Sequence, residues 1–156
     1  SLLSEDDQFM ALALRQEHRA YAQEEVTVGA VIVHNGKVIA RGFNQVEMLK
    51  DATAHAEMLA LTSAQGLLGD WRLVDCDLYV TKEPCPMCAG AIVHCRLRRV
   101  IFGCPSPKDG ACGSFLNLLD QPTLNHRATI TSGVRETECA DLLRSFFHEA
   151  RAQKAT

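Results

Sequence analysis

The chain has 156 residues, of which 47% are hydrophobic and 22% are charged, the balance of an ordinary globular protein. This length predicts a single domain over residues 1–156, and the composition excludes an intrinsically disordered or collagen-like chain. The net charge of −3 excludes a strongly basic nucleic-acid-binding protein. The longest apolar runs, such as residues 29–33, are much shorter than a membrane span, so no membrane partner is expected.

In chain order, the hydrophobic pattern predicts a helix at 5–23, strands at 26–34 and 38–43, a helix at 54–65, a strand at 77–81, a helix at 86–94, strands at 99–103 and 128–134, and a helix at 138–153. Asn35-Gly36 predicts a tight hairpin because both residues accept positive φ. The helix–strand alternation implies parallel strands covered on both faces, to which the hairpin adds an antiparallel pair. The expected fold is an α/β sandwich with a mixed sheet.

The seven cysteines are an odd number, and the acidic N-terminal segment has no signal-peptide pattern. We therefore expect a cytoplasmic, reducing location, where metal binding or burial explains cysteines better than disulfides do. Arg96, Arg98 and Arg99 form a local basic cluster. Such a cluster either faces RNA or is a solvated face of the protein.

Two short segments at the starts of predicted helices contain residues suited to catalysis. Residues 53–57 read Thr-Ala-His-Ala-Glu, and residues 83–88 read Glu-Pro-Cys-Pro-Met-Cys. Each segment alone is a weak signal, since a Cys-x-x-Cys pair can be buried, redox-active or metal-binding. A redox pair would leave His55 and Glu57 unexplained, so the two segments together favour a metal site.

The spacing of these residues predicts an open zinc site. Cys85 and Cys88 are three residues apart, so they are neighbours on a helix. Pro86 suits the first helical position, which places Cys85 at the N-cap, where the helix dipole favours thiolates. His55 supplies a third ligand. Three protein ligands are typical of a catalytic zinc ion, which keeps a fourth position for water.

Glu57 is expected beside the metal-bound water without being a ligand itself. Zinc lowers the pKa of bound water from 15.7 to about 7. The carboxylate can then move a proton from this water to a ring nitrogen and on to a departing amine. The pattern His-x-Glu followed by Pro-Cys-x-x-Cys resembles that of the zinc nucleobase deaminases.

The wider sequence, from about residue 5 to residue 152, resembles the bacterial tRNA-specific adenosine deaminases. The matching segments are 29–33, Asn44, 54–57, 79–81, 83–90, 113–119, 124–127 and 146–147. The resemblance implies a cytidine deaminase-like three-layer α/β/α sandwich with a five-stranded sheet. It also implies hydrolytic deamination of adenosine to inosine at the wobble position of a tRNA anticodon, typically in an arginine tRNA. A homodimer with one Zn²⁺ per subunit, acting on the anticodon stem-loop, is expected.

The resemblance also assigns roles to individual residues. The zinc ligands of the family correspond to His55, Cys85 and Cys88, and its proton shuttle corresponds to Glu57. Asn44, eleven positions before His55, corresponds to an asparagine that contacts the base.

Three further substrate contacts are expected. The backbone N–H of Ala56 belongs to the base pocket by the same resemblance. One ring of the Phe146–Phe147 pair is expected in the core and the other, assigned to Phe147, on a nucleotide. Ser106 stands where the family usually carries an acidic residue near the sugar, and we expect it to face substrate; alternatively, Asp109 takes over that role or the loop shifts.

Two other functions share parts of this site. A deaminase of a free nucleobase, nucleoside or nucleotide, of guanine or cytidine type, would use the same zinc chemistry. A non-catalytic zinc-bearing subunit would not need Glu57. The segment 124–127 and the terminal helix favour RNA over a free base.

Overall fold

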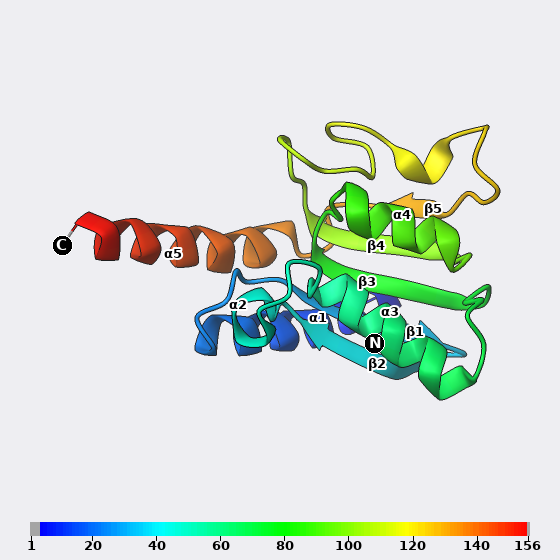
Figure 1. Cartoon of the computed structure of the whole chain (residues 1–156), viewed down its shortest axis with the longest axis horizontal. Coiled ribbons are helices and arrows are strands. Elements are labelled where there is room, and N and C mark those ends of the chain that lie inside the picture. Colours follow the sequence, from blue (N-terminus) through cyan, green and yellow to red (C-terminus); the bar gives the residue numbers. More distant parts are fainter. Residues whose placement is uncertain (1–3, 156) are drawn as a thin grey trace.

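The fold is seen in a computed structural model, which describes residues 4–155. The sheet has five strands in the order β2-β1-β3-β4-β5 (Figure 1). Strand β1 pairs antiparallel with β2 and with β3, whereas β3, β4 and β5 are parallel. The strands are β1 (Gly29–His34), β2 (Lys37–Phe43), β3 (Cys76–Lys82), β4 (Arg99–Cys104) and β5 (Thr129–Thr131). The predicted mixed five-stranded sheet is confirmed.

Helices cover both faces of the sheet, as predicted. They are α1 (Glu5–Ala22), α2 (Val46–Leu49), α3 (Ala56–Leu68), α4 (Pro86–His94) and α5 (Glu136–Ala155), with a short 3₁₀ helix η1 (Leu118–Asp120). Figure 1 shows α3 and α4 on one face, and α1 with the first part of α5 packs on the other. The rest of α5 extends beyond the edge of the sheet. None of the helices in the described residues is long and apolar enough to cross a membrane.

Alternating side chains in the strands build a core on each face. In β1, Ile32 packs in the cluster on the α3 and α4 side, whereas Val31 packs in the cluster on the α1 side. Strand β3 follows the same rule with Leu78 and Tyr79. This period of two buries the sheet on both faces, which anchors the helices that carry the functional residues.

Close backbone contact fixes the start of α3. An ideal Cβ atom at Gly42 in β2 would lie 2.3 Å from the carbonyl oxygen of Ala56. Only glycine allows this approach, because any side chain would collide with the first turn of the helix. The position of α3, and of the residues at its N-terminus, is therefore tied directly to the sheet.

Several element boundaries differ from the predictions. Helix α3 continues through Gly66, which has open space around it, and ends at Gly69 in the left-handed conformation. The first strand begins at Gly29 rather than at residue 26, and the last spans three residues instead of seven. The short helices α2 and η1 were not expected.

Candidate active site

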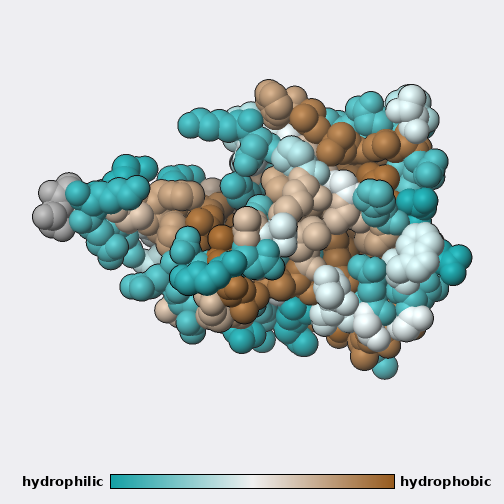
Figure 2. Space-filling view, in the orientation of Figure 1, coloured by the Kyte–Doolittle hydropathy of each residue, from teal (hydrophilic) through white to brown (hydrophobic). Residues whose placement is uncertain are grey.

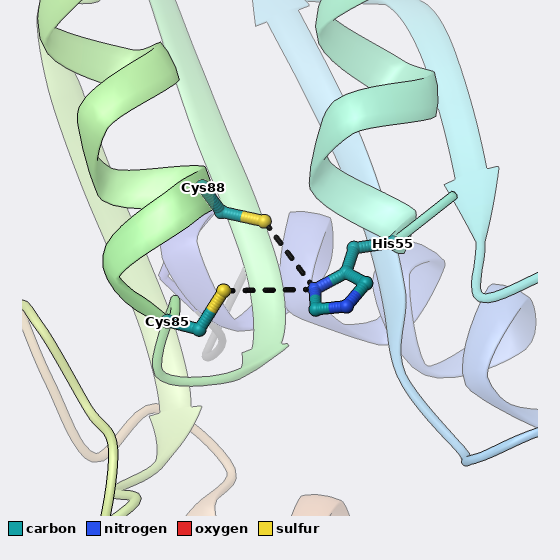
Figure 3. A group of neighbouring side chains, drawn as sticks. All are labelled: His55, Cys85 and Cys88. Carbon is teal, nitrogen blue, oxygen red and sulfur yellow. Dashed lines mark hydrogen bonds between the residues drawn. The ribbon is translucent and has the colours of Figure 1, made fainter. Parts of the chain in front are cut away.

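His55, Cys85 and Cys88 meet between the N-terminal ends of α3 and α4 (Figure 3). His55 is the N-cap residue of α3, and Cys85 is the N-cap residue of α4 with Pro86 next to it. Because β1 is antiparallel to both β2 and β3, those two strands run in the same direction. The helices that follow them therefore begin at the same edge of the sheet.

The distances between the three ligand atoms fit a tetrahedral zinc ion. His55 Nδ1 lies 3.6 Å from Sγ of Cys85 and 3.6 Å from Sγ of Cys88. Zinc–nitrogen and zinc–sulfur bonds of about 2.0 and 2.3 Å at a tetrahedral angle place nitrogen and sulfur about 3.5 Å apart. Within residues 4–155, this is the only group of three or more His, Cys, Asp or Glu side chains whose ligand atoms all lie within 4.8 Å of one another.

The surroundings of Cys85 favour its thiolate form, whereas those of Cys88 do not. The hydrogen bond with Cys88 lowers the pKa of the Cys85 thiol to about 4. The same interaction, together with burial, raises the pKa of Cys88, and the hydrogen bond with Cys85 raises the pKa of His55. Because a metal ion binds thiolates, metal binding at this pair is coupled to the release of protons.

Glu57 lies in the first turn of α3, and only 4% of its surface is exposed. Burial raises the pKa of its carboxyl group. The side chain lines the same cavity as His55 and Cys85. A buried carboxyl with a raised pKa can accept a proton and return it during a reaction.

The cavity has a volume of about 410 Å³, within the usual range for small-ligand sites. Its walls come from the segment after α1, the residues between β2 and α3, the turn after β3, the loop after β4 and helix α5. The lining contains one lysine, Lys82, and a larger set of acidic residues: Glu24, Glu25, Glu47, Glu57, Glu83 and Asp109.

Two residues expected to contact substrate line this cavity. Asn44 is 7% exposed, and its backbone N–H donates to the carbonyl oxygen of Val28 at 3.1 Å. Ala56 is the first residue of α3, so its N–H has no acceptor within the helix. Both residues are therefore placed where they can bind a base.

Ser106 and Phe147 lie differently from the expectation. Ser106 is 7% exposed and its hydroxyl group donates to Asp109, and it is Asp109 that lines the cavity. Phe147 is 42% exposed and borders a separate hollow on α5, whereas Phe146 lines the cavity. Adjacent residues on a helix point about 100° apart, so only one of the two rings can face the cavity. The alternatives weighed from the sequence, Asp109 and Phe146, occupy these positions.

Two buried carboxylates at the cavity were missed by sequence reasoning. Glu25 is 1% exposed and accepts hydrogen bonds from the N–H groups of Glu47 and Met48 at 3.0 and 2.7 Å. It caps α2 from 22 residues away, and no local pattern reveals such a cap. Glu83 lies inside the recognised cysteine motif, but its partners come from the loop after β4.

Two of the three arginines of the basic cluster are paired with aspartates in the structure. Arg98 forms a bidentate pair with Asp77, with both distances 2.9 Å. Arg99 pairs with Asp6 at 2.9 Å. Arg96 donates to the carbonyl oxygen of Val93 at the end of α4. These contacts give each arginine a structural role, as the solvated-face alternative expects.

Three zinc-type ligands, two of which line a cavity beside a buried carboxyl, define a hydrolytic metal site on an α/β/α fold. The family model described as the cytidine and deoxycytidylate deaminase zinc-binding region matches residues 3–104. The tRNA-specific adenosine deaminase of Bacillus subtilis (strain 168) is 45% identical over 152 residues, which cover 97% of this chain and 94% of that protein.

Solved structures agree with this similarity. A structure from a study of A-to-I editing by tRNA:A34 deaminases at the wobble position matches with a TM-score of 0.84 and 45% identity, covering 86% of this chain and 98% of that one. A guanine deaminase from Nitrosomonas europaea matches with a TM-score of 0.75 and 27% identity, covering 90% and 83%. The chain belongs to the zinc-binding cytidine and deoxycytidylate deaminase family.

Proposed function

We propose that the protein is a zinc-dependent enzyme that deaminates adenosine to inosine at the wobble position of a tRNA anticodon. The observation that carries this proposal is that His55 and Cys85 of the ligand triad line one cavity together with Glu57, in a chain that matches a tRNA-specific adenosine deaminase over 97% of its length. The family is a zinc-binding one. In this proposal, His55, Cys85 and Cys88 hold the ion.

The residues of the cavity supply the remaining chemistry. A zinc ion bound there lowers the pKa of water to about 7 and so provides a nucleophile at neutral pH. Glu57 takes a proton from water and passes it to a ring nitrogen of adenine as the hydroxide adds to C6. It then moves the proton of the new hydroxyl group to the amine, which leaves as ammonia when the C6–N bond breaks. Asn44 and the free N–H of Ala56 orient the base. The balanced reaction is adenosine and water to inosine and ammonia.

The substrate class follows from the comparisons together with the cavity. The Nitrosomonas europaea guanine deaminase is 27% identical, and a Bacillus subtilis guanine deaminase is 40% identical but covers only 63% of this chain. The tRNA-specific adenosine deaminase of Bacillus subtilis is 45% identical over 97% of this chain, so a free-base substrate is not favoured. We infer that the substrate is presented as an anticodon stem-loop, and we expect an arginine tRNA. A tRNA substrate also supports a cytoplasmic location.

We further propose that the protein is a homodimer. Figure 2 shows an apolar band across the face formed by α3 and α4. Large side chains such as Phe115 and Leu124 are 66% and 41% exposed. A second copy of the chain covering these groups would remove them from water, and light scattering of the purified protein would report the dimer mass.

The function is tested by measuring bound metal and comparing four substrates. We expect deamination of an arginine-tRNA stem-loop and little reaction with free adenosine, guanine or cytidine. A preference for free guanine or cytidine would establish the alternative. No reaction with any of these substrates, in protein loaded with zinc, would favour a non-catalytic subunit.

The ligand assignment has its own test. We expect the double variant Cys85→Ala, Cys88→Ala to lose zinc and to unfold at a lower temperature, because metal binding contributes to folding stability. Metal analysis by mass spectrometry, with the Cys76→Ala variant as a control, measures this. Full zinc occupancy in the double variant would refute the assignment.

A further inference from the structure

Glu83 follows β3 and holds one loop in place. The residue is 2% exposed, and its carboxylate accepts four hydrogen bonds, all from the loop at residues 105–117. Oε1 accepts from the N–H of Ser106 at 3.0 Å and from the hydroxyl group of Ser114. Oε2 accepts from the N–H groups of Cys112 and Ser114 at 3.0 and 3.1 Å. One buried carboxylate thus binds donors from both ends of a nine-residue stretch (106–114).

The loop also packs its backbone directly against this carboxylate. An ideal Cβ atom at Gly110 would lie 2.4 Å from the carboxyl carbon of Glu83 and 2.5 Å from both of its oxygens. The N–H of Ala111 donates to the carbonyl oxygen of Pro84 at 2.8 Å. The loop is therefore attached to the turn between Glu83 and the metal-binding pair, and side chains are excluded at Gly110.

This attachment determines where Asp109 lies. Asp109 sits between Ser106, whose N–H is bound by Glu83, and Gly110, which packs on Glu83. Ser106 donates its hydroxyl group to the carboxylate of Asp109. Asp109 lines the cavity, and it is an acceptor in the part of the lining contributed by this loop. The contacts lead from Glu83 through Ser106 to Asp109.

We propose that Glu83 is a positioning residue that holds the loop against the cavity, so that Asp109 faces the substrate. Glu83 then acts on substrate binding, and neither on metal binding nor on proton transfer. This inference rests on the proposed function and deepens it. It states that the loop at residues 105–117 forms the part of the cavity wall that selects the substrate, and that the buried carboxylate of Glu83 fixes this loop.

The four hydrogen bonds that Glu83 accepts require a carboxylate at this position. Each oxygen of Glu83 accepts two hydrogen bonds, and both donors to Oε2 are backbone N–H groups. In a Glu83→Gln variant, one oxygen is replaced by an NH₂ group, which cannot accept a hydrogen bond. At least one backbone N–H of the loop then faces another donor, although the shape of the side chain is unchanged. The substitution therefore tests hydrogen bonding and not packing.

Steady-state kinetics on an anticodon stem-loop provide the first test. We expect KM to rise roughly 5- to 100-fold in Glu83→Gln, while kcat stays within about threefold and zinc content is unchanged. Ser114→Ala removes one of the four bonds and should give a smaller rise in KM. Glu17→Gln, an isosteric change at a buried carboxyl that lies outside the cavity, is the matched control and should leave KM unchanged.

A double-mutant cycle tests the route through Asp109. Because Glu83 is argued to act through Asp109, the KM effects of Glu83→Gln and Asp109→Ala should not add in the double variant. Fully additive effects, a fall in kcat at unchanged KM, or loss of zinc from Glu83→Gln would each overturn the proposal.

Hydrogen exchange gives a readout that does not depend on activity. In Glu83→Gln, the amides of Ser106, Cys112 and Ser114 should exchange faster, whereas those of β3 should keep their protection. Unchanged exchange in the loop would overturn the proposal. If the wild-type protein deaminates no RNA, the proposed function fails. The rate of amide hydrogen exchange in the loop of Glu83→Gln still decides whether Glu83 holds the loop.

Discussion

Glu17 and Glu57 are both buried carboxyls, yet their surroundings differ. Glu57 lines the cavity beside the metal ligands. Glu17 is fully buried in α1, and neither of its carboxyl oxygens has a hydrogen-bond partner. A buried polar group without a partner lowers stability. The buried carboxyl of Glu17 therefore destabilises the fold, and it has no role in the catalytic site. Each carboxyl supports a separate prediction.

Glu57→Ala should abolish turnover while leaving zinc and the fold intact. General acid–base groups supply about 10²- to 10⁴-fold in rate. Glu57 is proposed to transfer more than one proton, so we expect kcat to fall by that range or more. Single-turnover rates with the stem-loop, together with metal analysis, measure the effect. Turnover near the wild-type value would place the shuttle elsewhere.

Glu17 should make stability depend on pH. Burial raises the pKa of its carboxyl from 4.5 to about 9. The folded state therefore keeps a proton that the unfolded state releases above pH 4.5, and the resulting stabilisation is lost as pH rises toward 9. Glu17→Gln removes this dependence at constant shape. We expect the variant to gain on the order of 2–3 kcal/mol relative to wild type between pH 5 and pH 7.

Urea unfolding of both proteins at pH 5, 6, 7 and 8 measures this difference, since groups shared by the two proteins cancel. The groups near Glu17 include the thiols of Cys104 on β4 and Cys139 on α5. Burial raises the pKa of the Cys104 thiol to about 11, so this thiol stays neutral over the range tested. A difference in stability that does not change with pH would mean that water or a rearranged partner reaches the carboxyl group.

At the scale of elements, the start of α4 could be read from the sequence. Pro86 and the cysteine spacing are local features, and α4 begins at Pro86 with Cys85 as its N-cap. The end of α3 could not be read in this way. Gly66 resembles a helix stop, but the stop is at Gly69, whose backbone adopts φ +64°. Whether a glycine ends a helix depends on what the following residues pack against, which is tertiary information.

The loop after β4 shows the same limit more strongly. Its conformation depends on the carboxylate of Glu83, which lies 23 to 31 residues earlier in the chain. No local pattern in residues 105–117 predicts those hydrogen bonds. This loop geometry explains why Asp109 lines the cavity and Ser106 does not. The meeting of His55, Cys85 and Cys88 was predictable because two short local motifs encode it, whereas the part of the cavity wall formed by this loop was not.

Helix α5 contributes one ring to the cavity, and the two phenylalanines provide a matched pair. Phe146 lines the cavity and Phe147 packs edge-on against it at 5.3 Å, on the outer side of the helix. Base–aromatic stacking contributes about 1–3 kcal/mol per base. We therefore expect Phe146→Ala to raise KM for a stem-loop by roughly 5- to 100-fold, and Phe147→Ala to change it little.

Stem-loop titrations with both variants, checked for equal melting temperatures, decide between the rings. A larger effect from Phe147→Ala would restore the assignment first made from the sequence.

For the molecule as a whole, the cavity depends on the sheet order. Its walls combine segments near residues 25, 44, 56, 84, 109 and 146. These segments meet because β2 and β3 run parallel to each other on either side of β1, and α5 returns past α1. The mixed sheet was predicted from the alternation of elements. The convergence of six separate segments was not, because it depends on strand order.

The charge of this cavity constrains how a nucleic acid can approach it. Six acidic residues and one lysine belong to the lining, and the chain as a whole has a net charge of −3. Phosphate groups are repelled by such a wall, whereas an uncharged base is not. A nucleotide can therefore enter with its base first, while its phosphates stay near the rim.

This geometry predicts a strong preference for unpaired adenosine. A base in a duplex must be flipped out, which costs a few kcal/mol for unstacking and unpairing, whereas the bases of an anticodon loop are already unpaired. We expect a stem-loop with adenosine at the wobble position to be deaminated efficiently. The same adenosine within a full duplex should react at least about 100-fold more slowly, as that cost implies. A duplex with the adenosine in a single-nucleotide bulge is the control, and it should recover much of the rate. Inosine formation, followed by nuclease digestion and chromatography, measures all three substrates. Equal rates on the stem-loop and the full duplex would show that the cavity does not select for an extruded base.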